Sequence, residues 1–273
     1  MIDYSQLQSK GFLVIPAFLD AENLIRLQKD YQVVKDSTHE FRNKNYQILL
    51  TNQHGLDDVI SKTINQVTEH TDIQVDSISR GATYFDNSLI DFTWHQDHEP
   101  YFLQQESYHG LNFWIPIIKH DTLTSGVSVI PFDRLPEKVK GTLVGKGAKQ
   151  FTCHAINNTT TVVDDASGKQ TILDINLDHV AESPELQPGD LLLMRQDTIH
   201  RTQAGTGPRV AVSVRCYNGN SILSRSWFFS GSFRKQMMIG NNDGLFKTIS
   251  EKFKRDNLSS FQLKTILEEM RKK

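Results

Sequence analysis

A histidine and an aspartate stand two positions apart near residue 96, where they could act together. They are His95 and Asp97, separated by Gln96. Side chains at positions i and i+2 of an extended segment point to the same face, so this imidazole and this carboxylate could chelate one metal ion. Such a pair also arises readily by chance in a chain with 10 histidines and 32 acidic residues. A polar surface turn is therefore the competing interpretation.

A third candidate ligand is His200, which lies in a turn after an apolar strand. The strand is predicted at Leu191–Arg195, and the turn before it is Pro188-Gly189-Asp190. Two histidines and one carboxylate on one face of an octahedron suit Fe(II) and leave coordination positions open for oxygen and a co-substrate. Together the three residues indicate a metal centre of this type.

Arginines at alternate positions of a later strand indicate an anion close to this site. The predicted strand Arg209–Tyr217 places Arg209, Ser213 and Arg215 on one face. If that face lines a small barrel, an unpaired guanidinium would be costly there. A dicarboxylate co-substrate would pair with Arg209 in bidentate fashion, and the Ser213 hydroxyl would be a further donor. Arg215 is the alternative partner for the same anion.

After about residue 72, the segments that must position these residues are rich in β-branched and aromatic residues and are separated by Gly, Pro, Asn and Asp. This pattern is typical of a β-sandwich or barrel. The predicted strands are Ser77–Phe85, Leu111–Ile117, Val127–Pro131, Leu191–Arg195 and Arg209–Tyr217, with a hairpin formed by Thr160–Val163 and Gln170–Asp174. Before this region we expect a strand at 11–16 and two helices, one capped by Asp20 and the other over Leu56–Glu69. The chain should end in helix from about residue 241. The loops 99–108 and 134–150 should border the mouth of the barrel.

In the order and spacing of these motifs, the chain resembles the phytanoyl-CoA dioxygenase-like branch of the Fe(II)/2-oxoglutarate-dependent oxygenases. The resemblance extends from residue 11 to about Tyr217 and includes His95-Gln96-Asp97, the strand Leu111–Ile117, Gly189-Asp190 with the apolar strand leading to His200, and Arg209 with Ser213. It implies a mainly β fold, a double-stranded β-helix or jelly roll with flanking α-helices. One departure is Pro131-Phe132-Asp133-Arg134, where the family often has Pro-Gly-Ser-His.

The resemblance also implies roles for individual residues. The matching positions for iron are His95, Asp97 and His200, and those for the distal carboxylate of 2-oxoglutarate are Arg209 and Ser213. Asn112 and Arg80 could reach the same co-substrate, because each lies on a strand predicted to flank the pocket.

These roles imply a non-haem Fe(II)- and 2-oxoglutarate-dependent oxygenase that uses O2 to hydroxylate a C–H bond of a small-molecule substrate, with release of succinate and CO2. Two other classes stay open. A cupin-like metal-dependent isomerase or hydrolase would use a similar barrel with a His-rich site, but it would have no need of an inward Arg209. A catalytically silent binding module would keep the fold but would usually have lost a ligand.

Composition and charge argue against several other classes of protein. The 273 residues carry 30 Lys and Arg against 32 Asp and Glu, a formal net charge of −2, so we expect no nucleic-acid partner. No apolar run reaches the ~20 residues that cross a bilayer, so we expect no membrane partner. Cys153 and Cys216 have no CxxC spacing, and we expect both to be reduced in a cytoplasmic protein. We expect one oxygenase domain, with an N-terminal segment 1–71, a β-helix core of about 72–230 and a C-terminal helical segment of about 241–273.

Overall fold

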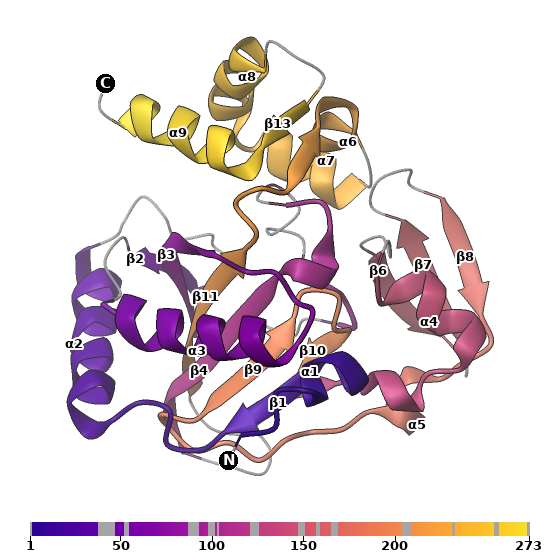
Figure 1. Ribbon diagram of the computed structural model, residues 1–273, viewed down its shortest axis with the longest axis horizontal. Helices are drawn as coiled ribbons and strands as arrows, with labels where there is room; N and C mark the ends of the chain where they lie inside the picture. Colours follow the sequence, from indigo (N-terminus) through magenta and orange to yellow (C-terminus); the bar gives the residue numbers. More distant parts are fainter. Residues whose placement is uncertain are drawn as a thin grey trace.

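A six-stranded antiparallel sheet forms the larger layer of the molecule (Figure 1). The structure is a computed structural model that describes residues 2–37, 47–51, 55–86, 93–97, 102, 104–120, 126–146, 151–156, 159–164, 169–203, 209–230, 233–253 and 257–271. The strands of this sheet, in spatial order, are β1 (Phe12–Ile15), β9 (Leu191–Arg195), β4 (Leu111–Lys119), β11 (Arg209–Tyr217), β3 (Ser77–Asp86) and β2 (Gln47–Thr51). Except for β2 and β3, neighbours in this order are not consecutive strands of the chain, so crossover connections join them.

A smaller sheet packs against one face of the larger one. Its strands β5 (Val127–Val129) and β10 (His200–Thr202) are antiparallel. Single β-bridges extend it, from His200 to His95 and from Val129 to Glu182. Two facing antiparallel sheets with crossed connections form a jelly roll, as the sequence predicted.

The alternation of side chains along the strands separates two apolar cores. Val210, Val212 and Val214 of β11 pack in the cluster that lies under the helices α2 (Ala21–Ser37) and α3 (Asp57–His70). Ala211 packs in the cluster between the two sheets. Alternate side chains of a strand share a face, so the face of Ala211 also carries Arg209, Ser213 and Arg215. This face lies toward the interior of the jelly roll.

The two predicted N-terminal helices cover the outer face of the large sheet (Figure 1). The carboxylate of Asp20 accepts a hydrogen bond of 2.8 Å from the backbone N–H of Asn23, so Asp20 caps α2 as predicted. On α3, Ile60, Ile64 and Val67 are buried against the sheet. No helix in the described part of the chain is both long and apolar enough to span a membrane.

An insertion between β5 and β9 forms a second unit beside the jelly roll. It contains α4 (Glu137–Leu143), α5 (Leu177–Val180) and the antiparallel strands β6 (Phe151–Ile156), β7 (Thr159–Asp164) and β8 (Gln170–Leu173). The predicted hairpin is therefore present as β7 and β8. Strand β6 was not predicted, and α4 lies inside the predicted loop 134–150. Val139 and Leu143 of α4 are buried, which explains why this short segment is ordered as a helix.

The C-terminal elements gather at one end of the molecule (Figure 1). They are β12 (Ile222–Ser224), α6 (Arg225–Phe229), α7 (Phe233–Gly240), α8 (Asp243–Lys252), β13 (Asn257–Ser259) and α9 (Ser260–Arg271). The helices form as expected, and they begin earlier than residue 241. Three short helices complete the described structure: α1 (Gln6–Ser9), η3 (Ser107–His109) and η4 (Phe132–Arg134).

Of the two cysteines, only Cys216 has a side chain within the described residues. Cys216 on β11 is buried and forms no disulfide. Burial raises the pKa of its thiol well above the usual range. The side chain of Cys153 lies outside the described residues.

Candidate active site

The structure brings His95, Asp97 and His200 together inside the jelly roll. One ligand atom from each residue lies within 4.8 Å of the others, and all three residues are buried. The backbones of His95 and His200 exchange two hydrogen bonds of 2.9 Å, which fixes the two histidines opposite each other in the small sheet. His200 Nε2 lies 3.5 Å from Asp97 Oδ1. The cluster is therefore created by pairing between segments about 100 residues apart in the chain.

Both imidazole rings are held through the same nitrogen atom. His95 Nδ1 is 2.7 Å from the carbonyl oxygen of Thr93, and His200 Nδ1 is 2.9 Å from the carbonyl oxygen of Thr198. A carbonyl can only accept, so each Nδ1 carries a proton, and in the neutral ring the lone pair is then on Nε2. This is the tautomer that metal-binding histidines need, with the second nitrogen oriented by the backbone.

Asp97 is ionised in this environment. Burial by itself would raise the pKa of its carboxyl group, but the charge of Arg215 and the contact with His200 outweigh burial and hold the pKa well below the usual range. The second carboxylate oxygen, Oδ2, lies 3.1 Å from Arg215 Nη2 and accepts a hydrogen bond of 3.0 Å from Asn112 Nδ2. A carboxylate that stays charged is a suitable metal ligand.

Arg209 lies at the other end of the same strand face as Arg215. It is buried, its guanidinium donates to the carbonyl oxygen of Gly126, and it lies 5.7 Å from the ring centroid of Trp114. Burial lowers the pKa of Arg209 to about 10, so the side chain is still a cation at neutral pH. The position is suited to an anion that reaches into the jelly roll.

Lys119 is a second buried cation that the sequence analysis did not single out. It lies directly opposite Arg209 on β4, and its Nζ is 3.7 Å from the place where a Cβ on Gly126 would stand. Residues opposite each other on neighbouring strands share a face, and like charges in that arrangement repel. The ammonium of Lys119 donates to the carbonyl oxygen of Leu186 at 2.9 Å, so a second positive charge is held near Arg209 in the interior.

The other residues predicted to reach the co-substrate are Ser213, Asn112 and Arg80. Ser213 Oγ donates to Asn112 Oδ1 at 2.8 Å, so both residues belong to the network around Asp97. Arg80 lies on β3, but its side chain is outside the described residues. Arg215, the alternative to Arg209, contacts Asp97.

Comparison with solved structures identifies the fold. No family model and no curated protein sequence matches the chain. The structure is similar to EctD from S. alaskensis, solved with 2-oxoglutarate and 5-hydroxyectoine, with 11% identity, a TM-score of 0.54 and coverage of 82% of this chain and 78% of that one. It is also similar to EvdO2 from Micromonospora carbonacea var. aurantiaca complexed with 2-oxoglutarate, with 14% identity, a TM-score of 0.53 and coverage of 79% and 89%. The chain has the jelly-roll fold of these 2-oxoglutarate-binding proteins.

A third solved structure with a similar fold is that of an epimerase. SnoN, described as a non-heme alpha ketoglutarate dependent epimerase from nogalamycin biosynthesis, has 11% identity and a TM-score of 0.52, with coverage of 82% of this chain and 85% of that one. At such identities the comparison establishes the fold and leaves the reaction to the residues of the site.

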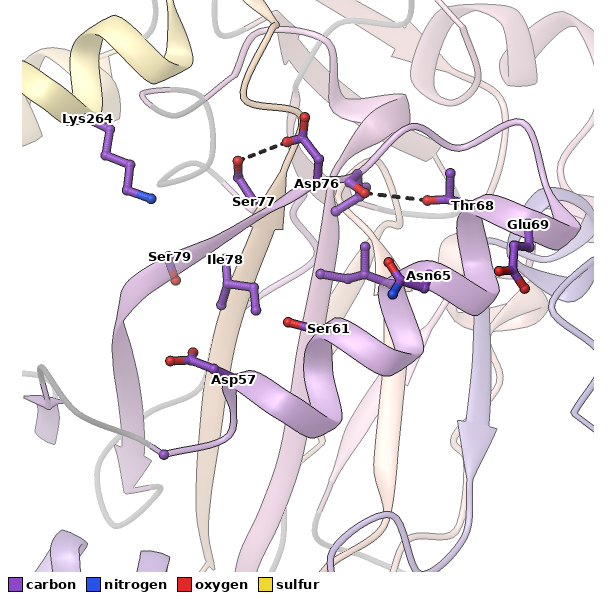
Figure 2. A pocket seen from close by; sticks show the side chains of 13 residues that line it. Asp57, Ser61, Asn65, Thr68, Glu69, Asp76, Ser77, Ile78, Ser79 and Lys264 are labelled. Atoms are coloured by element: carbon purple, nitrogen blue, oxygen red, sulfur yellow. Dashed lines mark hydrogen bonds between the residues drawn. The ribbon is translucent and has the colours of Figure 1, made fainter.

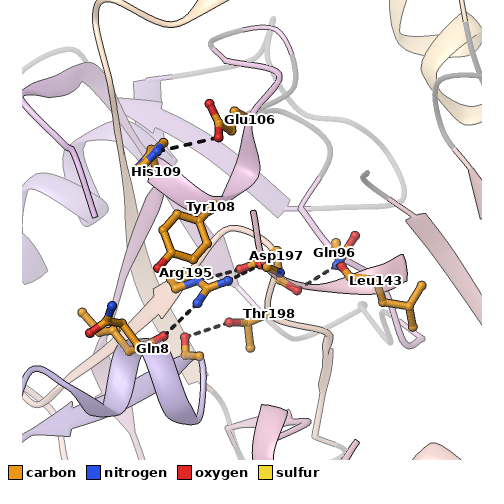
Figure 3. A network of polar contacts seen from close by, with 12 residues as sticks. Gln8, Gln96, Glu106, Tyr108, His109, Leu143, Arg195, Asp197 and Thr198 are labelled. Atoms are coloured by element: carbon orange, nitrogen blue, oxygen red, sulfur yellow. Dashed lines mark hydrogen bonds and ion pairs between the residues drawn. The ribbon is translucent and has the colours of Figure 1, made fainter. Parts of the chain in front are cut away.

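A network of hydrogen bonds beside the candidate metal ligands connects the segment of His95 and Asp97 with the segment of His200 (Figure 3). Gln96, between the two predicted ligands, donates to the carbonyl oxygens of Asp197 at 2.7 Å and of Leu143 at 2.6 Å. The carboxylate of Asp197 pairs with Arg195, and both side chains are buried. No role was predicted for Gln96 or Asp197, although their positions next to the candidate ligands in the sequence were a usable signal.

A separate polar groove lies outside the jelly roll, between α3, β3 and α9 (Figure 2). Its volume is about 990 Å³, and its lining residues are Gly55, Asp57, Ser61, Ile64, Asn65, Thr68, Glu69, Val75, Asp76, Ser77, Ile78, Ser79 and Lys264. These residues include none of the candidate ligands, so the groove is distinct from the candidate active site.

Proposed function

We propose that this protein is a non-haem Fe(II)- and 2-oxoglutarate-dependent oxygenase that hydroxylates a C–H bond of a small-molecule substrate. The observation that carries the proposal is the cluster of His95, Asp97 and His200 inside the jelly roll, with ligand atoms within 4.8 Å of one another. Arg209 is a buried cation on the same interior surface, and this favours 2-oxoglutarate, a dicarboxylate, as the co-substrate. The motif order supports membership of the phytanoyl-CoA dioxygenase-like branch, with residues 1–273 acting as one domain.

The residues present fit Fe(II). Two imidazole Nε2 atoms and one carboxylate oxygen are the donor set that suits Fe(II), and three protein ligands would leave coordination positions for the co-substrate and O2. Both Nδ1 atoms are already bound to backbone carbonyls, so the rings need no rotation. The chemistry that Fe(II) supplies with O2 and 2-oxoglutarate is oxidation of the substrate C–H bond, with succinate and CO2 as co-products.

Arg209 and Lys119 provide the electrostatic partner for the distal carboxylate of 2-oxoglutarate. A guanidinium can hold a carboxylate through two parallel N–H donors, and an ammonium adds a point charge. Trp114 lies beside Arg209 and keeps this end of the interior apolar, which strengthens the attraction. An enzyme that used the metal alone, such as a cupin-like isomerase or hydrolase, would have no use for the two cations.

The test is anaerobic titration of the purified protein, first with Fe(II) and then with 2-oxoglutarate. We expect one bound metal ion, followed by the visible charge-transfer absorption of a 2-oxo acid chelated to Fe(II). Admission of O2 should then produce succinate, slowly without substrate and faster with the correct small molecule. His95→Ala and His200→Ala should each abolish specific metal binding, because each removes one of three ligands.

Two other outcomes would overturn the proposal in different ways. Metal binding without 2-oxoglutarate binding would favour a metal-dependent isomerase or hydrolase. A folded protein that binds no metal ion would be a catalytically silent binding module.

A further inference from the structure

We propose that Arg215 and Asn112 are positioning residues that hold one oxygen of Asp97, so that the carboxylate binds the metal through its other oxygen alone. The inference rests on the proposed function, because it concerns a ligand of the same metal centre. It assigns to Arg215 and Asn112 a task other than contact with 2-oxoglutarate.

The two oxygens of Asp97 have different neighbours. Oδ1 faces the ligand cluster, 3.5 Å from His200 Nε2. Oδ2 contacts Arg215 Nη2 at 3.1 Å and Asn112 Nδ2 at 3.0 Å. All these groups are nearly inaccessible to water, since the Asp97 and Arg215 side chains are 8% and 12% exposed. Only Oδ1 is therefore directed at a metal ion in the cluster.

The orientation of the Asn112 amide is determined by its own partners. Its Oδ1 accepts hydrogen bonds from Ser213 Oγ at 2.8 Å and from Arg215 Nη1 at 2.6 Å. With two donors on the carbonyl oxygen, the amide nitrogen must point the other way, toward Asp97. Asn112 and Arg215 are also directly paired across β4 and β11, so the register of the large sheet holds both groups in place.

Monodentate binding has a chemical consequence for the site. A carboxylate that binds through both oxygens occupies two coordination positions, whereas one that binds through a single oxygen occupies one. An Oδ2 bound to two donors keeps a position open for the co-substrate or oxygen. Partners of this kind, which orient a ligand without touching the metal, contribute strongly to metal affinity.

A different role for Arg215 would change the metal affinity of the variant in the opposite direction. If Arg215 were only a cation near the metal, its charge would repel the ion, and its removal would tighten metal binding. If Arg215 positions Asp97, its removal should weaken metal binding despite the loss of repulsion. Asn112 carries no charge, so its removal tests the positioning role without this electrostatic complication.

The experiment measures Co(II) affinity by calorimetry in the absence of 2-oxoglutarate, which removes any effect of direct contact with the co-substrate. We expect Arg215→Met and Asn112→Ala each to bind Co(II) about 10–100-fold more weakly than the unchanged protein. The Co(II) affinity of Arg215→Lys should lie between those of Arg215→Met and the unchanged protein, because an ammonium keeps the charge but lacks the planar fork of a guanidinium. The visible absorption of bound Co(II) should also change in both variants as the carboxylate becomes free to bind through two oxygens.

A matched control is Arg201→Met, which removes the arginine next to His200 in the chain. Arg201 pairs with Asp178 and stacks on Trp94, so its loss should leave Co(II) affinity and absorption unchanged. Thermal unfolding of each metal-free variant shows which are folded, and if Arg215→Met is not, Asn112→Ala alone decides by the same criterion. Unchanged or tighter Co(II) binding by the folded variants would overturn the inference. Failure of the unchanged protein to bind any divalent ion would instead overturn the proposed function.

Discussion

At the scale of single residues, the site depends on which atom of each side chain is already bound. The two histidines have their Nδ1 atoms on backbone carbonyls, and the aspartate has its Oδ2 on two donors. The atoms left over, two Nε2 and one Oδ1, are those directed at a common point. These hydrogen bonds restrict the three candidate ligand side chains, which would lower the entropy lost when a metal ion binds.

Arg209 should separate co-substrate binding from metal binding. Arg209→Ala should leave Fe(II) affinity nearly intact, because Arg209 contacts none of the three ligands in the described structure. It should weaken 2-oxoglutarate binding by ~2–5 kcal/mol, roughly thirty-fold to several-thousand-fold, since a desolvated carboxylate loses its partner. Arg209→Lys should restore only part of the affinity. The measurement is anaerobic titration of the iron-loaded protein with 2-oxoglutarate.

The outcome that would contradict this role is specific. If Arg209→Ala bound 2-oxoglutarate normally and Arg215→Met, with its metal restored at high concentration, did not, then Arg215 would be the carboxylate partner. Lys119→Met provides a second check. We expect it to lose less 2-oxoglutarate affinity than Arg209→Ala, because it removes a point charge and keeps the Arg209 guanidinium.

At the scale of elements, the turn between β9 and β10 holds the second histidine in place. Arg195 at the end of β9 donates to Asp197 at 2.9 Å, and Asp197 also accepts from the backbone N–H of Gly145 at 2.7 Å. The Arg195 guanidinium lies over the rings of Tyr108 and Phe132, at 4.2 Å and 4.6 Å from their centroids. Neutralising either partner would leave the other charge buried and uncompensated.

Asp197→Asn should therefore lower the free energy of unfolding by ~3–5 kcal/mol, measured by urea denaturation of the metal-free protein. Arg195→Met combined with Asp197→Asn should recover part of the loss, because the double variant leaves no unpaired charge. A similar stability for the single variant and the unchanged protein would mean that the pair has no such role. Metal affinity should fall in parallel, since Gln96 is bound to the carbonyl oxygen of Asp197.

At the scale of the whole molecule, the C-terminal helices are attached to the segment that follows the candidate ligands His95 and Asp97. Phe102 lies 5.2 Å from Phe228, centroid to centroid, inside a cluster of aromatic rings. Gln105 exchanges hydrogen bonds with the backbone of Ser224, at 3.1 Å and 2.8 Å. The described part of the loop 99–108 is thus largely held in place, with Gln104 and Tyr108 buried.

Phe228→Ala should destabilise the protein by ~3–5 kcal/mol and increase amide exchange in residues 104–110. Phe228 is 1% exposed, whereas Phe261 of α9 is 62% exposed. Phe261→Ala is therefore the matched control and should change stability by no more than ~0.5 kcal/mol. Equal exchange in residues 104–110 of both variants would show that the C-terminal helices do not anchor this loop.

Unfolding of the unchanged protein tests whether the chain behaves as one unit. Trp94 and Trp114 are buried near the candidate site, and Trp227 belongs to the C-terminal helices. Coincident transitions by tryptophan fluorescence and far-UV circular dichroism would support one cooperative domain. Two separate transitions would indicate that the C-terminal helices form a domain of their own.

Local sequence patterns determined much of the architecture. The alternation along Arg209–Tyr217 put Arg209, Ser213 and Arg215 on one face because side chains of a strand alternate whatever the strand pairs with. The Asp20 cap and the apolar face of α3 likewise depend on residues within one or two turns. The apolar runs of β4 and β9 marked strands covered on both faces, as both are in the jelly roll.

Tertiary structure alone decided which of these residues meet. Lys119 lies opposite Arg209, and Asn112 opposite Arg215, because β4 and β11 are neighbours in a sheet whose order the chain does not state. Strand β6 and helix α4 were missed for the same reason: β6 pairs with β7, and α4 is short and depends on buried Val139 and Leu143. Cross-strand contacts join residues about 100 positions apart, so local propensity carries no information about them. Which oxygen of Asp97 contacts Arg215 and Asn112 is thus a property of the assembled sheet.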